Sequence, residues 1–440
     1  MLSILADRTY RHLFLAQVVA LLGTGLATVA LGLLAFDLAG EGAAMVLGTV
    51  FTIKMVAYVG IAPVAGAFAD RINRRAFLVT LDLVRAGCAL ALPFVTETWQ
   101  VYVLIFLLQS ASAAFTPTFQ ATIPDVLPEE ERYTRALSLS RLAYDIENIA
   151  SPTLAALLLM VLSHDGLFLG TAAGFAASAL LVLSVVLPGP KPSSVRRGIY
   201  DRTTRGIRIY LATPRLRGLL ALSLTVAAAG AMVLVNSVVL VRGRLGLSDS
   251  ALAWVMFAFG AGSMIAALAL PRLLDRLPDR PVMLTGAGLM VAVLLGLATA
   301  MAMAGLSLTL LMGAWLVMGL GYATVMTPSG RLLRRSAQPE DRPAVFAAQF
   351  ALSHACWLLA YPLAGWLMTR FGAVPALIGL AVPAGLGIGA ALWLWPADTP
   401  DEVEHTHDNL PPDHPHLQGH RRHSHALIVD DLHPRWATRF

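Results

Sequence analysis

Long apolar stretches recur along this 440-residue chain, separated by short polar segments or by segments containing glycine and proline. Twelve of the stretches are about long enough to cross a lipid bilayer as helices. They cover residues 11–39, 44–69, 76–95, 100–122, 135–163, 166–187, 216–242, 249–272, 281–304, 306–334, 342–370 and 372–396. Because a helix satisfies its own backbone hydrogen bonds in lipid, the pattern predicts an all-α membrane protein with twelve transmembrane helices.

The composition agrees with membrane insertion and argues against a nucleic-acid partner. The chain is 57% hydrophobic and only 13% charged, about half the charge of an average soluble protein. Its net charge of +5 comes almost entirely from arginine at the ends of apolar stretches, as the positive-inside rule describes. The two cysteines, Cys88 and Cys356, lie inside apolar stretches, so a disulfide framework is not expected.

Loops rich in arginine alternate with loops such as "AGEG", "TETWQ", "SHDG" and "AMAG". The arginine-rich loops belong in the cytoplasm, with Arg242 and Arg244 as an exception on the outer side. An even number of spans then places both termini in the cytoplasm. We therefore expect a multi-pass protein of the inner (plasma) membrane.

The longest internal loop divides the chain into two similar halves. "GAFADRINRRAFL" follows the second stretch and "PRLLDRLPDRPVML" follows the eighth, so that Asp70 and Asp275 lie 205 residues apart (275 − 70). Parallel repeats of six helices are a transporter architecture, with the substrate bound near mid-membrane. The expected units are a first half (1–187), a cytoplasmic linker (188–215), a second half (216–396) and a disordered tail (397–440).

The segment "GAFADRINRR" resembles the G-x-x-A-D-R-x-G-R-R/K loop signature of the major facilitator superfamily. Asn73 stands where the signature has glycine, and because both residue types tolerate positive φ, we expect the turn to be kept. The segments "DLVRAG" and "TPTFQATIPDVLPEE" resemble the exporter branch that includes the enterobactin exporter. The resemblance implies a charge network that gates the cytoplasmic side. Its expected members are Gly66, Asp70, Arg71, Arg74 and Arg75, with Asp275 and Arg276 in the second half.

The tail segment "HTHDNLPPDHPHLQGHRRHSH" holds seven histidines in 21 residues. Neutral imidazole binds Ni²⁺, Co²⁺, Cu²⁺ and Zn²⁺, and the prolines and glycine disfavour a helix, so a flexible, metal-binding tail is predicted. Accidental enrichment in a solvated tail is the alternative. A membrane body with such a tail resembles the nickel-resistance (NreB-type) exporters of bacteria, which implies export of nickel or cobalt. The candidate ligands are His405, His407, His414, His416, His420, His423 and His425.

Polar residues in the middle of three apolar stretches are candidates for a transport site, because such groups are costly in lipid. Asp145, Glu147 and Asn148 lie about 11–14 residues past the cytoplasmic end of the fifth stretch, at a depth of roughly 16–21 Å. His354 in the eleventh stretch lies at a similar depth, on the face that the repeat relates to that of Glu147. Histidine and carboxylates from two halves suit a first-row metal. Lys54 in the second stretch could neutralise the carboxylates when metal is absent.

These residues also have structural interpretations. Asp145 could pair with Arg141 one turn away, because intramembrane charges usually pair. His354 could make a hydrogen bond between helices, and Lys54 could extend its amine toward the outer interface.

A nucleotide-binding loop of the form G-x-x-x-x-G-K-[S/T] is absent, which favours secondary transport by rocking of the two halves. The hypothesis is a monomeric exporter of a divalent metal ion, nickel or cobalt, driven by proton antiport. The metal is the substrate, and no cofactor is expected. Two alternatives stay open: an exporter of a drug, siderophore or metal chelate, and a membrane metal sensor without transport. The lack of HExxH and GxSxG patterns counts against an enzyme.

Overall fold

The computed structural model describes most of the chain. The described residues are 2–68, 73–129, 157–188, 199–274, 276–338, 341–397, 402–406, 422–426 and 428–429, with isolated positions between 132 and 155. Within them, ten stretches are long and apolar enough to cross a membrane. The first, Arg8–Ile61, includes both α1 and most of α2, so it accounts for two of the predicted spans. The fifth predicted span, 135–163, lies mostly outside the described residues.

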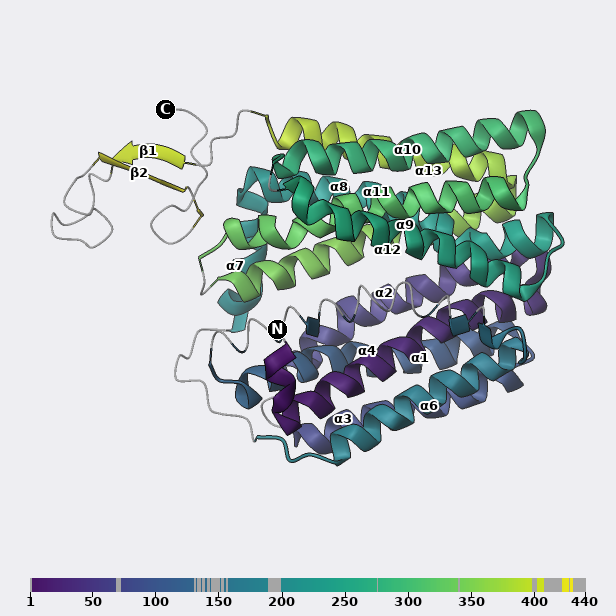
Figure 1. The fold of residues 1–440 in the computed structure, drawn as a ribbon, viewed down its shortest axis with the longest axis horizontal. Helices are drawn as coiled ribbons and strands as arrows, with labels where there is room; N and C mark the ends of the chain where they lie inside the picture. The colour runs from purple at the N-terminus through teal and green to yellow at the C-terminus, as the bar shows by residue number, and fades with distance from the viewer. Residues whose placement is uncertain are drawn as a thin grey trace.

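The first half is a bundle of long helices, drawn below the second half in Figure 1. Its elements are η1 (Leu2–Ala6), α1 (Arg8–Ala39), η2 (Gly40–Gly42), α2 (Ala43–Phe68), α3 (Arg74–Ala91), η3 (Leu92–Phe94), α4 (Thr98–Val126) and α6 (His164–Leu183). These bounds agree with the apolar stretches to within a few residues, because lipid-spanning helices must be apolar over their length.

The second half packs beside the first, with α2 and α12 at the junction. Its elements are α8 (Pro214–Val238), the π-helical turn η4 (Val239–Arg244), α9 (Asp249–Leu274), α10 (Asp279–Ala304), α11 (Leu308–Arg335), α12 (Arg342–Phe371) and α13 (Ala373–Leu394). The prediction of an all-α membrane fold in two helical halves is confirmed.

The two ends of the bundle differ in what they carry. The first helical turn η1, the linker helix α7 (Ile199–Ala212) and the tail strands β1 (Glu402–Thr406) and β2 (Arg422–Ala426) lie at one end, on the left of Figure 1, which we call the linker end. The opposite end carries the short connections after α1, α3, α8, α10 and α12, and we call it the short-loop end. The charge rule predicts that the linker end faces the cytoplasm.

Close contact between the halves depends on glycines in α2 and α12. A Cβ built at Gly48 of α2 would lie 2.8 Å from the Tyr361 carbonyl oxygen of α12, and one at Gly365 would lie 2.5 Å from the Ala44 carbonyl oxygen. Small residues allow membrane helices to approach backbone to backbone in this way. Because Ala44 and Gly48 begin α2, the close crossing lies near the short-loop end.

The predicted linker (188–215) contains the helix α7, which is docked on the second half. Arg205 donates two hydrogen bonds to Asp341, at 2.5 Å (Nε–Oδ1) and 2.9 Å (Nη2–Oδ2). A Cβ at Gly206 would overlap the backbone carbonyl of Ala344. Burial raises the pKa of the Tyr210 phenol, so this hydroxyl stays protonated and donates to Oε1 of Gln349 in α12. The linker is therefore attached to α12 by side-chain contacts.

Two short strands lie within the segment for which a disordered tail is predicted. β1 (Glu402–Thr406) and β2 (Arg422–Ala426) pair antiparallel, with His405 opposite His423 and Val403 opposite His425. Pro411, Pro412, Pro415 and Gly419 fall between the strands in the sequence, where they do not interrupt the ladder. His407, His414, His416 and His420 lie outside the described residues.

Candidate functional site

Helices α2 and α12 bring a cation and a set of aromatic rings together across the boundary between the halves. Lys54 Nζ lies 6.0 Å from the ring centroid of Tyr58. The Tyr58 ring stacks on the His354 ring at 5.7 Å, and the Phe350 and His354 rings lie 3.9 Å apart. Lys54 and Tyr58 belong to the first half, whereas Phe350 and His354 belong to the second.

Further aromatic residues continue this group toward the short-loop end. Tyr361 stacks on Phe51 of α2 at 4.9 Å and also lies 4.9 Å from Trp357. Gly230 of α8 makes room for the Trp357 indole, because a Cβ there would overlap the ring. We call the whole group the aromatic cluster. It consists of Phe51, Lys54, Tyr58, Phe350, His354, Trp357 and Tyr361.

The histidine in the aromatic cluster has one ring nitrogen engaged by its own helix. His354 Nδ1 lies 2.6 Å from the Phe350 carbonyl oxygen, and since a carbonyl only accepts, Nδ1 is the donor. This leaves Nε2 for another partner. Among the described residues, no group of three histidine, cysteine, aspartate or glutamate side chains could hold a metal ion. The predicted partners Asp145, Glu147 and Asn148 lie outside the described residues, so this metal site stays a prediction.

The loop motif after α2 is described from Asn73 onward, and it corrects one expectation. Asn73 has φ −62°, not a positive φ, and its side chain caps α3 by accepting from Ala76 N at 3.1 Å. Asparagine is therefore used here as an N-cap rather than as a substitute for a turn glycine. Asp70 and Arg71 lie outside the described residues, and Gly66 lies in the last turns of α2.

The two arginines that begin α3 link it to α4 and α6 at the linker end of the first half. Arg74 forms an ion pair with Asp125 near the end of α4. Arg75 donates to the Leu183 carbonyl at the end of α6. Both arginines were expected in a gating network, but Asp125 was not named as a partner.

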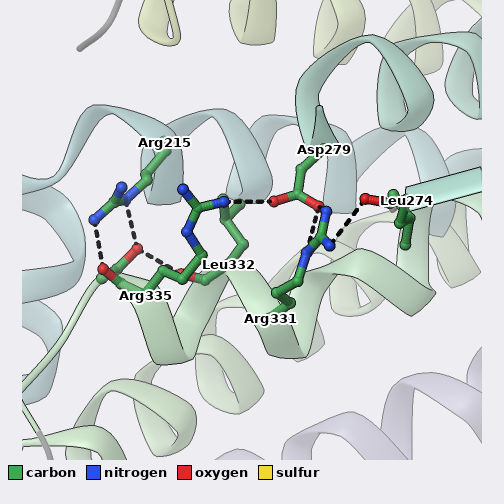
Figure 2. A network of polar contacts seen from close by, with 7 residues as sticks. Arg215, Leu274, Asp279, Arg331, Leu332 and Arg335 are labelled. Carbon is green, nitrogen blue, oxygen red and sulfur yellow. Dashed lines mark hydrogen bonds and ion pairs between the residues drawn. The ribbon is translucent and has the colours of Figure 1, made fainter. Parts of the chain in front are cut away.

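The matching region of the second half holds a larger network, shown in Figure 2. Asp279, at the start of α10, accepts from Arg331 of α11, with Nε–Oδ1 at 2.9 Å, and lies 3.6 Å from Arg335 Nη1. Arg215 at the start of α8 donates to Ser336 Oγ at 2.8 Å and to the Arg335 carbonyl at 2.6 Å. The network thus joins α8, α10 and α11.

Sequence reasoning missed this network because it searched for a second copy of the same residue types. Asp275 lies outside the described residues, and Arg276 is exposed. The offset that relates Asp70 to Asp275 also relates Arg74 to Asp279. Searching that offset for opposite charges would have found Asp279.

One buried ion pair lies within the first half. Asp82 pairs with Arg85 on α3 and accepts from Ser178 Oγ of α6 at 2.7 Å. The Arg85 guanidinium lies between the rings of Phe115 and Phe175, at 4.2 and 4.5 Å. The pair links α3, α4 and α6, and it has the geometry of a structural contact.

Two helical halves of this kind, joined by a long linker and meeting at an aromatic interface, define a polytopic transporter. The sequence profile described as "Major Facilitator Superfamily" matches residues 13–241 and 219–428. The chain belongs to this superfamily, which is one of transporters rather than enzymes.

Individual relatives are distant. The chain is 26% identical over 301 residues to the uncharacterized MFS-type transporter YfiS of Bacillus subtilis, covering 65% of this chain and 69% of that protein. It is 28% identical over 152 residues to macrolide efflux protein A of Streptococcus pyogenes, covering 33% of this chain and 37% of that protein. The latter match therefore spans little more than a third of the macrolide protein.

The fold is also that of solved transporters. A bacterial homologue of the human lysosomal transporter Spinster, in an inward-facing and occupied conformation, superposes with a TM-score of 0.69 at 12% identity. The superposition covers 88% of this chain and 96% of that one. At this identity the likeness concerns the fold alone.

Proposed function

We propose that the protein exports an amphipathic organic molecule from the cytoplasm by alternating access, the drug-exporter alternative of the sequence analysis. The observation that carries this proposal is the aromatic cluster, in which α2 and α12 contribute rings from both halves. A substrate held between the halves would contact both, which alternating access requires.

The chemistry of the aromatic cluster indicates which organic molecules fit. Ring faces bind flat apolar groups by stacking, and Tyr58 and Trp357 can add a polar contact. The ammonium of Lys54 attracts anionic groups and repels cations. A neutral or anionic amphiphile with an aromatic ring therefore fits better than a free divalent cation. Similarity to a macrolide efflux protein and to multidrug resistance proteins of the MdtG type supports an organic substrate.

The energy source and the topology belong to the same proposal. Proton antiport would drive export against a gradient, with Asp145 and Glu147 as proton carriers and Asn148 beside them. The termini, α7 and the tail would face the cytoplasm from an inner membrane, and the monomer would be the transporting unit.

A transport assay in inverted membrane vesicles tests the organic substrate. The probes are an anionic aromatic dye and a cationic dye with the same rings, each offered with and without a proton gradient. We expect gradient-dependent accumulation of the anionic dye, lost in Tyr58→Ala and reduced in Lys54→Gln. Phe106→Ala is the matched control, because Phe106 is 45% exposed on the outside of the bundle. Equal loss in the control, or accumulation of neither dye, would contradict the proposal.

Nickel or cobalt export is a second candidate, favoured by the tail. The register of β1 and β2 sets His405 opposite His423, with His425 two residues further along the strand. Imidazoles so spaced suit a first-row metal. The same vesicles, offered Ni²⁺ and Co²⁺, test it with the full chain and with a chain ending at Pro396. Metal accumulation by both forms, with no dye accumulation, would select this candidate and leave the tail an accessory role.

A further inference from the structure

Four charged or titratable residues join the two halves at the short-loop end. Asp37 lies near the end of α1 and His164 begins α6, so both belong to the first half. Arg242 lies in η4 and Asp249 begins α9, so both belong to the second half. We call these four residues the clasp.

Arg242 lies at the centre of the clasp. Its Nη1 donates to Asp37 Oδ1 at 2.7 Å and lies 3.4 Å from Asp249 Oδ1. The guanidinium also lies 4.8 Å from the ring centroid of Phe36 in α1. The shortest polar contact of this arginine therefore crosses the boundary between the halves, and a longer one stays within its own half.

His164 lies beside Asp37, the carboxylate that the first half contributes to the clasp. His164 Nε2 lies 3.3 Å from Asp37 Oδ2, and its Nδ1 lies 3.9 Å from Asp249 Oδ2. Asp37 thus has a partner in its own half besides the arginine of the other half. Each half contains one basic and one acidic member of the clasp.

The backbone of η4 beside the clasp also packs against the first half. A Cβ at Gly243 would lie 3.0 Å from Glu41 Oε1 of η2 and 3.3 Å from Phe36 Cε2. The turn η4 therefore contacts the connection between α1 and α2, which belongs to the other half. Any movement that separates the halves at this end must break the bond between Asp37 and Arg242.

We propose that the clasp holds the short-loop end closed and releases it by partner exchange, in which Arg242 leaves Asp37 and pairs with Asp249 alone. This inference rests on the proposed alternating access. After release, Arg242 keeps its ion pair with Asp249, and Asp37 keeps the His164 imidazole as a polar partner. Exchange of this kind lets an ion pair bias a conformational equilibrium while both states stay populated.

The clasp also explains why Arg242 departs from the positive-inside rule. The outer side disfavours arginine as an exposed residue between spans, but Arg242 lies between two carboxylates and over an aromatic ring. The local negative charge of Asp37 and Asp249 compensates its positive charge. The exception in the sequence thus marks a contact between the halves.

If Arg242 exchanges partners, neutralising Asp37 and neutralising Asp249 should shift the open population in opposite directions. Asp37→Asn weakens the bond that closes the clasp, so the open population should rise. Asp249→Asn removes the partner that receives Arg242 on opening, so the open population should fall. If the clasp were structural and no exchange took place, the two variants would not shift the open population in opposite directions.

The test is a distance measurement between spin labels on the two halves, without substrate. Labels at Thr96→Cys and Ala304→Cys report the short-loop end, because both sites are exposed and lie at the connections that follow α3 and α10. The background carries Cys88→Ala and Cys356→Ala, which remove the native thiols. We expect the long-distance population to rise at least about threefold in Asp37→Asn and to fall by a similar factor in Asp249→Asn.

Two further variants keep the result interpretable. Asp165→Asn is the matched control: Asp165 lies 3.4 Å from His164 on the same helix and is 50% exposed, so the distances should not change. Arg242→Gln should behave as Asp37→Asn does. Shifts of the same sign in both aspartate variants, or no shift in either, would overturn partner exchange. Because the readout involves no substrate, failure of the dye assay leaves this result unaffected.

Discussion

The two halves hold their linker ends together with the same kind of contact but with the charges exchanged. In the first half, Arg74 at the start of α3 pairs with Asp125 at the end of α4. In the second half, Asp279 at the start of α10 pairs with Arg331 near the end of α11. The repeat therefore preserves an ion pair at a position in the fold while its polarity is reversed. The position of a contact is a better guide to the pseudo-symmetry than residue identity.

In the second half, the pair has further partners among the described residues. Asp279 also faces Arg335, whose carbonyl accepts from Arg215, and Arg331 donates to the Leu274 carbonyl at 3.2 Å (Figure 2). The linker helix α7 is docked on this half as well, through Arg205 and Asp341.

Asp279→Ala should have the largest effect on stability. The Asp279 side chain is 4% exposed, and its loss leaves two guanidiniums facing each other without a carboxylate. We expect a loss of about 2–3 kcal/mol, below the full cost of breaking a buried pair because both arginines reach solvent. Thermal unfolding in detergent measures it. Arg276→Ala, at an exposed position of the same loop, should stay within about 0.5 kcal/mol.

Exchanging the charges of Arg74 and Asp125 tests whether an ion pair of either polarity stabilises the first half at this position. Arg74→Asp alone places two carboxylates together and should destabilise by roughly 2 kcal/mol. Adding Asp125→Arg should recover at least about half of this loss, because the second half holds the reversed pair at the equivalent place. A double variant as unstable as the single one would show that the two positions are not equivalent.

Gly206→Ala should loosen the linker from the second half without affecting the first. The new methyl group overlaps the Ala344 carbonyl, and overpacking of this kind costs about 1–3 kcal/mol. We expect faster proteolytic cleavage in the linker. Gly288→Ala, where a Cβ meets nothing within 4 Å, is the matched control and should leave the cleavage rate unchanged.

Asn73→Ala should have the smallest effect. It removes the cap of α3, at a cost of about 1 kcal/mol, whereas Asn73→Asp keeps an accepting oxygen and should be close to neutral. In the second half the N-cap residue of α10 is Pro278, which provides no side-chain cap. Thermal unfolding of both variants measures the loss of stability. An equal loss in Asn73→Ala and Asn73→Asp would exclude a capping role.

Most of the fold could be predicted from the sequence, whereas only some parts of the candidate site could. The apolar stretches located α1 and α13 to within a few residues because lipid requires continuous apolar helices. Lys54 and His354 stood out as polar residues in such stretches. Their common neighbour Tyr58 did not, because an aromatic ring in a membrane helix is ordinary and only packing of α2 on α12 brings it between them.

The tail shows a different limit. Its prolines and histidines predict a flexible chain, and they gave no sign that β1 and β2 would pair. Strand pairing depends on which two segments come into contact. The amino-acid composition of the whole tail does not contain that information. The nickel and cobalt assignment rests on this tail and on the candidate ligands in the membrane, and it stays a proposal.

The sequence by itself determined the all-α membrane fold, the positions of the described helices and the membership of a transporter superfamily. These properties follow from local rules, since the cost of burying polar groups in lipid applies to each stretch separately. The tertiary structure alone decided three contacts. Arg242 binds Asp37, Asp279 forms an ion pair at the position equivalent to Arg74, and α7 is docked on α12. Those contacts join residues far apart in the chain, and their energy depends on geometry that no local pattern contains.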